Sequence, residues 1–345
     1  MKELKEISWL VDEPTYRADS AISFSTLSKF YREGFSSLNK LYDKIETPSL
    51  TFGSMVDSLI TGGIEEFNER FALIQDFGIS DSLRQITKTL YDTYKEFYAS
   101  LDDIPNNILS DVAENCGYYV GPKYYNARVK KVRECAQYYE ALNKMEGKTP
   151  ITQQQYNDAF DCVRILKTSP TTETLFAEDT DNLKHYYQLK FKGEYEGIDL
   201  RCMADLVILD YENKVIYPYD LKTSGHPEWE FPKSFVCWNY YWQAQIYWYL
   251  IRQNLDKDEY FKDFKLEDYQ FIVISNATRT PLLWKFEGTK ATGECYYRDY
   301  TLPSWRSAIK ELDYYLNEEP RVPIGISVTE PNSIKEWLEK GILLN

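Results

Sequence analysis

Residues 203–222, MADLVILDYENKVIYPYDLK, decide the fold of this chain. Two runs rich in aliphatic residues lie on either side of the polar turn sequence 210–213, and this pattern is typical of a β-hairpin. Near-continuous apolar runs indicate strands that are covered on both faces of a sheet. The segment therefore predicts two antiparallel strands in the interior of an α/β sheet.

The register of this hairpin brings two acidic residues together. If the chain turns tightly about Glu212 and Asn213, Asp205 lies opposite Asp220, and such partners have Cβ atoms about 4.5–5.5 Å apart. Lys222 shares a face with Asp220, because alternate residues of a strand point the same way. A bulge at Pro218, which cannot donate a ladder hydrogen bond, would shift this register by one residue.

Two facing carboxylates repel each other unless a cation lies between them. Mg²⁺ or Mn²⁺ would relieve the repulsion, because hard cations take oxygen ligands. Lys222 could orient or activate a water, or stabilise the negative charge that develops at phosphorus. Asp205, Asp220 and Lys222 thus predict metal-assisted hydrolysis of a phosphodiester. The plain alternative is an exposed charge pair on an edge strand.

The rest of the chain predicts alternating blocks of helix and strand. Strands are expected at 185–191, 198–209, 215–221, 269–275 and 280–286, with a turn at 193–197 and a long helix at 233–254. We expect one domain, 1–345, with a helical N-terminal region at 1–63 and a helical insertion at about 64–180. The sheet and catalytic core then cover about 181–290, and a helical tail covers about 303–345.

Composition excludes several classes of protein. The 345 residues include 43% hydrophobic residues, which rules out wholesale disorder. With 54 acidic and 40 basic residues the net charge is −14, which argues against a non-specific polyanion binder. The six cysteines lack the spacing of a zinc or iron–sulfur site. Two histidines, His185 and His226, leave little material for nucleophilic catalysis, and we expect both to be structural or loop residues.

The sequence also predicts a cytoplasmic protein that does not enter a membrane. The N-terminus lacks the apolar run of a signal peptide. Residues 234–251 carry no charge, but Asn239, Gln243, Gln245 and four tyrosines make a buried helix of a soluble protein the better interpretation.

Four segments, in order, resemble the PD-(D/E)XK nuclease superfamily, and most closely its phage and prophage exonuclease VIII (RecE-like) branch. They are ISFSTLSKF at 22–30, TFGSMVD at 51–57, Asp205 with Asp220-x-Lys222, and YYWQAQIY at 240–247. The second resembles the family's G-x-x-x-H segment and the fourth its Q-x-x-x-Y helix. The set of four is fairly specific, whereas each segment alone is not.

This resemblance implies a restriction-endonuclease-like core, in which helices flank a central mixed sheet, with a large helical insertion. It implies a Mg²⁺- or Mn²⁺-dependent exonuclease acting on double-stranded DNA ends in phage or prophage recombination inside a bacterial cell. It also implies a homo-oligomer and a single-strand annealing protein as partner. A structure-specific or end-processing endonuclease and a catalytically inactive binding protein of the same fold are the alternatives.

The resemblance also assigns roles to further residues. Asp205 and Asp220 would bind the metal, and Gln243 would support Lys222 or the scissile phosphate. Asp57 stands where the family has a metal-ligand histidine, so it is either a third oxygen ligand or a solvated residue on a short helix. Tyr247 lies on the same helix face as Gln243 and belongs either to the site or to an aromatic core.

A chain this acidic needs a local group of basic residues if it is to bind DNA. Lys123, Arg128, Lys130 and Lys131 cluster beside Tyr124 and Tyr125, which is a weak signal for contacts with phosphates and bases. A solvated helix face is the plain alternative.

Overall fold

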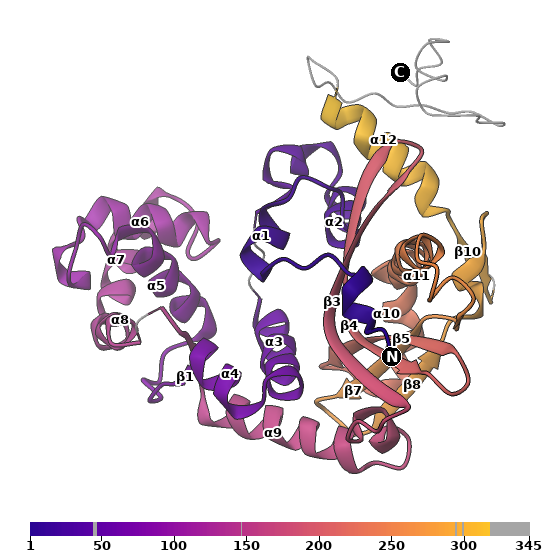
Figure 1. Ribbon diagram of the computed structural model, residues 1–345. Helices are drawn as coiled ribbons and strands as arrows, with labels where there is room; N and C mark the ends of the chain where they lie inside the picture. Colours follow the sequence, from indigo (N-terminus) through magenta and orange to yellow (C-terminus); the bar gives the residue numbers. More distant parts are fainter. Residues whose placement is uncertain (44–46, 146, 294, 299, 318–345) are drawn as a thin grey trace, which may run out of the picture. The chain divides into compact units, whose positions relative to one another are not determined.

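The computed structural model describes residues 1–43, 47–145, 147–293, 295–298 and 300–317. These residues form two compact units, which are Ser58–Phe160 and the remainder, Met1–Asp57 with the chain from Asp161 onward (Figure 1). Helices α3 (Pro48–Thr61) and α9 (Gln153–Thr168) run from one unit into the other. The predicted insertion at 64–180 and the unit Ser58–Phe160 overlap over residues 64–160.

The first unit is built on a mixed sheet. Among the described residues this sheet has six strands: β3 (Leu183–Tyr195), β4 (Ile198–Asp210), β5 (Val215–Ser224), β6 (Lys265–Leu266), β7 (Gln270–Ser275) and β8 (Pro281–Lys285). The order is β3-β4-β5-β7-β8, and β6 pairs with β5. β5 runs parallel to β6 and β7, whereas the β3–β4, β4–β5 and β7–β8 pairs are antiparallel. All five predicted strands are present, and the fold is α/β.

The β4–β5 hairpin has the predicted register. Leu206 pairs with Tyr219, and the ladder runs without a shift to Asp210 and Val215. On its other side β5 pairs over 215–216 with β6 and over 219–224 with β7, so Pro218 falls between the two ladders and its missing N–H costs nothing. Extending the register by one residue places Asp205 opposite Asp220.

The predicted turn at 193–197 is shorter than expected. β3 continues to Tyr195, and only Glu196 and Gly197, both with positive φ, make the turn. Gly193 is a strand residue for a packing reason. A Cβ there would lie 2.9 Å from Leu250 Cδ2 and still closer to Gln253 Oε1, so the glycine lets a helix approach the strand.

The predicted helix at 233–254 is two helices, α10 (Phe231–Cys237) and α11 (Tyr240–Asp256). Asn239 separates them in a left-handed conformation with φ of 56°, which asparagine adopts more readily than most residues. Its side-chain oxygen accepts a hydrogen bond of 2.9 Å from the Tyr241 hydroxyl. Within the described residues, no helix has the length and apolar character needed to cross a membrane.

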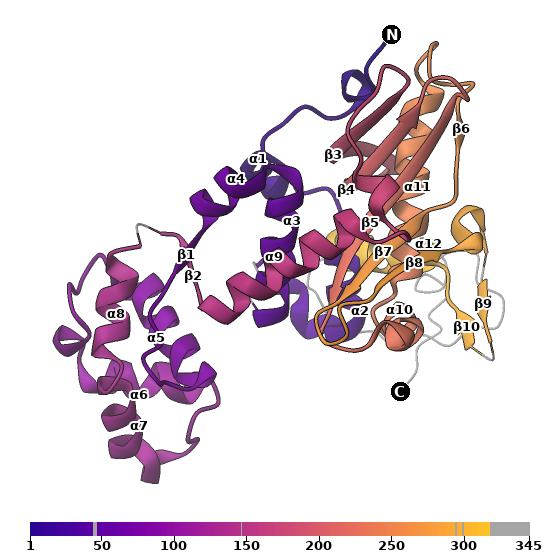
Figure 2. The ribbon, with the colours of Figure 1, turned by 90° about the horizontal axis from the view of Figure 1, so that it is seen from below.

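Helix α11 lies along β3 and β4 and carries much of the core of this unit (Figures 1 and 2). Trp242 of α11 is fully buried, as are Phe191, Phe271 and Trp305 of the surrounding elements. The remaining elements of the unit are η1 (Leu4–Ile7), α1 (Glu13–Ala18), α2 (Phe24–Glu33), η2 (Gly34–Lys40), η5 (Glu173–Phe176), η6 (Glu228–Glu230), η7 (Glu287–Lys290), β9 (Cys295–Tyr297), β10 (Tyr300–Leu302) and α12 (Trp305–Asn317). The predicted helical tail is present in α12, and its part at 318–345 lies outside the described residues.

The second unit, Ser58–Phe160, is mainly helical, as the pattern over this region predicts. Its elements are α4 (Gly63–Arg70), β1 (Phe71–Leu73), α5 (Asp81–Tyr94), η3 (Leu101–Asp103), α6 (Asn106–Asn115), η4 (Pro122–Tyr124), α7 (Tyr125–Arg133), α8 (Ala136–Asn143) and β2 (Thr149–Ile151). It has its own core, in which Ile86 and Leu90 of α5 pack with Leu109, Val132 and Tyr139. The short strands β1 and β2 pair in parallel.

Candidate metal and catalytic site

Asp220 of β5 is held from two sides by predicted site residues. Its side chain is 2% exposed. Oδ1 accepts a hydrogen bond of 2.5 Å from Gln243 Nε2 of α11, and Oδ2 lies 2.5 Å from Lys222 Nζ. Asp220 therefore contacts both Lys222 and Gln243. This arrangement arises because α11, which carries Gln243, lies against the sheet beside Asp220 and Lys222 of β5.

Asp205 of β4 is the second carboxylate of the group. Its Oδ2 accepts the backbone N–H of Leu221 at 2.9 Å, which ties it to β5 beside Asp220. Burial, followed by the neighbouring Asp220 and Asp57 carboxylates, raises the pKa of Asp205 well above its ordinary range. Lys222 and the Leu221 N–H oppose this rise without cancelling it. The pair thus carries the repulsion that the sequence predicts.

Lys222 supplies the positive charge of the site. Burial lowers its pKa, but the carboxylate of Asp220 and the other oxygens around it outweigh burial and raise the pKa above its ordinary value. Nζ also lies 4.8 Å from the centre of the Tyr240 ring, which favours a cation. Lys222 is therefore an ammonium group, 21% exposed, at the edge of the carboxylate pair.

Asp57, the third candidate ligand predicted from the sequence, is brought to the same place by α3. A Cβ on Gly53 of this helix would lie 3.3 Å from Thr223 Oγ1 of β5, so the glycine favours a close approach of helix and strand. Gln188 Nε2 of β3 donates hydrogen bonds to Asp57 Oδ1 at 2.8 Å and to Asp205 Oδ1 at 3.4 Å. Asp57 is thus a neighbour of the carboxylate pair.

Gln188 is a site residue that the sequence analysis missed. The signal was present, because a two-residue turn at Glu196 and Gly197 sets a β3–β4 register in which position 188 faces Asp205. Placing the turn over 193–197 hid this relation.

Two buried tyrosines complete the surroundings. Tyr247 of α11 and Tyr269, just before β7, meet edge to face with ring centres 5.8 Å apart. Burial is the main cause that raises both pKa values well above the ordinary range, and Asp220 and Asp205 add to it. Tyr247 is therefore both a core residue and a neighbour of the site. Tyr269 was not predicted, because only the parallel β5–β7 pairing brings it near Asp220.

The oxygen atoms of the site fit a hard cation. Gln243 Oε1 and the Tyr269 hydroxyl are buried without a hydrogen-bond partner in the part of the chain that the structure describes. Over the same residues, no three His, Cys, Asp or Glu side chains are arranged together as metal ligands. Mg²⁺ commonly uses only one or two carboxylates and keeps several waters, so Asp205 and Asp220 suffice as the protein ligands of such a site.

The basic cluster predicted to contact DNA lies in the second unit, and one member needs correction. Arg128 is 2% exposed, and its guanidinium donates to Glu114, Ser110 and backbone oxygens of the 119–121 segment. It is an internal support of the unit and does not face solvent. Lys123 and Lys130 are exposed, and Lys131 is paired with Glu134 at 2.7 Å.

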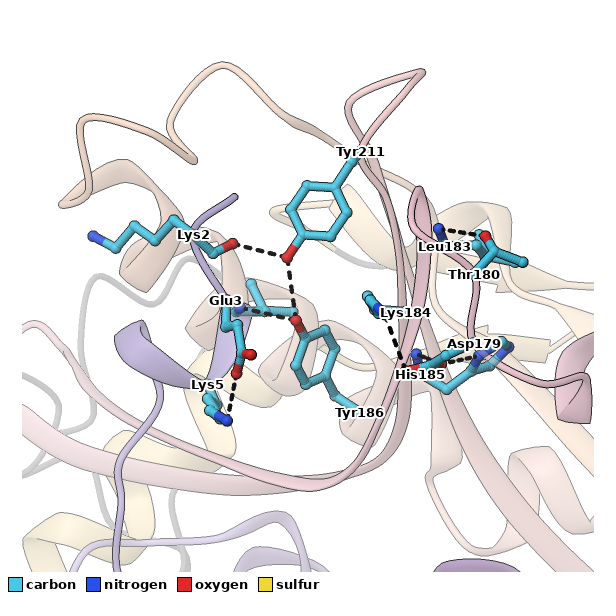
Figure 3. Close-up of polar contacts among 11 residues, drawn as sticks. Lys2, Glu3, Lys5, Asp179, Thr180, Leu183, Lys184, His185, Tyr186 and Tyr211 are labelled. Carbon is cyan, nitrogen blue, oxygen red and sulfur yellow. Dashed lines mark hydrogen bonds and ion pairs between the residues drawn. The ribbon is translucent and has the colours of Figure 1, made fainter.

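His185 belongs to a separate polar cluster at the start of β3 (Figure 3). Its Nδ1 lies 2.9 Å from Asp179 Oδ1. Nearby, the Tyr211 hydroxyl donates to the Lys2 carbonyl at 2.8 Å and lies 3.3 Å from the Tyr186 hydroxyl. The two tyrosines fasten the N-terminal segment to β3 and to the residue that follows β4, whereas His185 is held by Asp179; all of these contacts are structural.

Comparison with known proteins gives little beyond this geometry. No protein-family model and no curated protein matches the chain. Among solved structures, a crystal structure described as “Putative exonuclease” from Eubacterium rectale is 13% identical, with a TM-score of 0.44, and the match covers 95% of this chain and 98% of that one. A likeness this distant does not extend to chemistry.

Proposed function

We propose that this chain is a divalent-metal-dependent DNA nuclease. The observation that supports it is the group in which Asp205 faces Asp220 while Lys222 and Gln243 bind Asp220 from either side. A pair of repelling carboxylates beside a fixed ammonium is costly to fold, and it matches the charges of a cation and a phosphodiester.

Each residue has a distinct task in this proposal. Asp205 and Asp220, with Asp57 beside them, would hold Mg²⁺ or Mn²⁺, which when bound supplies Lewis-acid activation of the phosphodiester and of water. Lys222 places a positive charge where negative charge develops on the phosphate and orients the attacking water. Gln243 fixes the Asp220 carboxylate through its 2.5 Å hydrogen bond.

The finer part of the proposal is an exonuclease that digests double-stranded DNA ends in phage or prophage recombination, with an annealing protein as partner. Its support is the resemblance of four ordered segments to the RecE-like branch, together with the position of Asp57 beside Asp205. A homo-oligomer is proposed on the same resemblance.

The test is a digestion assay with Mg²⁺ or Mn²⁺, in which linear duplex labelled at one 5′ end is compared with a covalently closed circle. Progressive loss of the linear duplex alone is the expected result. Lys222→Ala and a chelator should each abolish it. Lys310→Ala is the matched control, because Lys310 pairs with Glu196 at 2.7 Å away from the carboxylates.

Other outcomes are informative as well. Cutting of the circle would replace the exonuclease with an endonuclease. Digestion that survives in folded Lys222→Ala protein would contradict the site assignment. No cleavage with either metal would favour a binding protein built on the same fold.

A further inference from the structure

Gln188 has a backbone conformation that its position in the sheet does not require. It lies inside β3, yet its φ is 52°, in the left-handed region that disfavours residues with a side chain. Tyr187 pairs with Leu206 and Leu189 with Ala204, so the register is the same on both sides. No residue is inserted here, and the strained residue is therefore not the by-product of a bulge.

At this strained position the side-chain amide contacts two carboxylates. Gln188 Nε2 donates to Asp57 Oδ1 at 2.8 Å and to Asp205 Oδ1 at 3.4 Å. The amide nitrogen has two hydrogens, so one group serves both carboxylates. One carboxylate comes from α3 and the other from β4, and the Gln188 amide contacts both.

The register adds a second observation. By register, positions 188, 205 and 220 fall in one row across β3, β4 and β5. Gln188 and Asp205 stand at the position that the β3–β4 ladder skips, and Asp220 stands opposite Asp205 when the β4–β5 ladder is extended by one residue. A neutral amide therefore lies next to two carboxylates of the same row. Strained residues persist where the surrounding structure holds them, and they are common at functional sites.

We propose that Gln188 is a positioning residue of the metal site, whose amide holds the Asp57 and Asp205 carboxylates in the arrangement in which they bind one divalent cation. This inference rests on the proposed function. It makes Asp57 a member of the metal site, and it explains why a glutamine with a costly backbone conformation is kept in the middle of a strand.

The experiment is Mn²⁺ titration calorimetry on the full chain, with melting temperatures measured in parallel. Gln188→Gly is the decisive variant, because it removes the side chain with its amide while glycine adopts the positive φ of this position without strain. We expect Mn²⁺ affinity to fall by about 10-fold or more while the metal-free melting temperature does not fall. Gln188→Ala should lose the same affinity and melt lower.

The matched control is Gln253→Ala. Gln253 links α11 to the same strand β3 through the backbone of Glu194, at 3.0 and 3.1 Å, and should leave Mn²⁺ affinity unchanged. Because the amide contacts both the Asp57 and the Asp205 carboxylates, Gln188→Gly should lower Mn²⁺ affinity by a smaller factor in an Asp57→Ala background than in the wild type.

The two hypotheses fail in different ways. Wild-type affinity in Gln188→Gly, or equal losses in Gln188→Gly and Gln253→Ala, would overturn the positioning role and leave the proposed nuclease standing. A wild-type chain that binds no Mn²⁺ and cuts no DNA would overturn both.

Discussion

Asp205 lies on β4. Two other carboxylates, Asp220 of β5 and Asp57 of α3, are close enough to raise its pKa. Its pKa is raised in the folded chain, so folding favours its protonated form. Its contribution to stability is present below the pKa of the unfolded chain and is lost as pH rises through the raised pKa. Above that raised pKa, the ionised group therefore lowers the stability of the metal-free protein.

We predict that Asp205→Asn makes the metal-free protein more stable and at the same time inactive. The neutral amide removes the repulsion, which above the raised pKa of Asp205 should add about 1 kcal/mol, or a few degrees of melting temperature. The gain should therefore be largest at alkaline pH and should shrink as pH falls through that pKa, because the wild-type carboxyl then becomes protonated. Thermal melts across that pKa, with Mn²⁺ calorimetry and the digestion assay, test the prediction.

Asp210→Asn is the control on the same strand. Burial raises the pKa of Asp210, but hydrogen bonds from Asn213, at 2.8 and 2.9 Å, outweigh burial and lower the pKa. The ionised Asp210 therefore stabilises the folded protein at neutral pH, and this stabilisation is lost on acidification. The Asp210→Asn variant should accordingly melt at a lower temperature than the wild type. Equal effects of the two substitutions would contradict the electrostatic account of Asp205.

A second prediction compares two buried glutamines of α11. Gln243 donates to Asp220, whereas Gln245 donates to the Gly288 carbonyl at 2.9 Å. Replacing either with Ala leaves a buried partner unsatisfied and should cost about 1–3 kcal/mol. Only Gln243→Ala should reduce the rate of DNA cleavage, by about 10-fold or more, because only it frees a site carboxylate. The ratio of the two rates at matched protein stability measures this difference.

Helix α11 depends, as an element, on the residue that precedes it. The left-handed Asn239 lets α10 end and α11 begin in a new direction, and α11 then places Gln243 against Asp220. We predict that Asn239→Val lowers the free energy of unfolding by about 1–2 kcal/mol more than Asn239→Gly does, because a β-branched residue resists positive φ. Both variants lose the hydrogen bond to Tyr241. The difference between their free energies of unfolding, measured with denaturant, therefore reports the cost of the backbone conformation. A smaller loss in the valine variant would rule out this explanation.

In strand β3, by contrast, a long regular element supports one strained residue. Its ladder with β4 skips the position of Gln188 and resumes in the same register on the other side, so the strained residue does not shift the pairing of the two strands. Thirteen residues of β3 and thirteen of β4 hold the conformation in place. A long, regular hairpin can therefore carry a local cost of about 1–3 kcal/mol at one position.

At the scale of the whole molecule, the chain divides into two compact units, and every carboxylate of the site belongs to the unit built on the sheet. The second unit is stabilised from within by Arg128, which pairs with Glu114 at 2.8 Å. We predict that Arg128→Ala weakens the second unit by about 3 kcal/mol, because it removes a buried ionic partner.

Calorimetric melting with and without Mn²⁺ tests this division. Mn²⁺ should raise the transition of the sheet unit only, by binding its folded state, and Arg128→Ala should lower the other transition only. Lys130→Ala, an exposed change on the same helix, should alter neither. A fall in Mn²⁺ affinity in Arg128→Ala would show that the site depends on the second unit.

The sequence by itself determined the β4–β5 hairpin and the carboxylate pair, Asp205 and Asp220, that it carries. Alternation, apolar runs and the turn at Glu212 and Asn213 are local signals, and they predicted the strands and the pairing that sets Asp205 against Asp220. Lys222 followed from its spacing on the same strand. Register within a hairpin is fixed by a few neighbouring residues, which is why it can be read without the fold.

Only the tertiary structure decided which side chains from distant parts of the chain lie beside this carboxylate pair. Asp57, for which the sequence left a ligand and a solvated residue open, reaches it through the approach of α3. Tyr269 reaches it through a parallel pairing that leaves no local pattern, and the strained backbone of Gln188 leaves none either. The same is true of Arg128, whose basic side chain reads as a surface residue until packing encloses it. Long-range packing is decided by the shapes of whole elements, and single stretches of sequence do not record it.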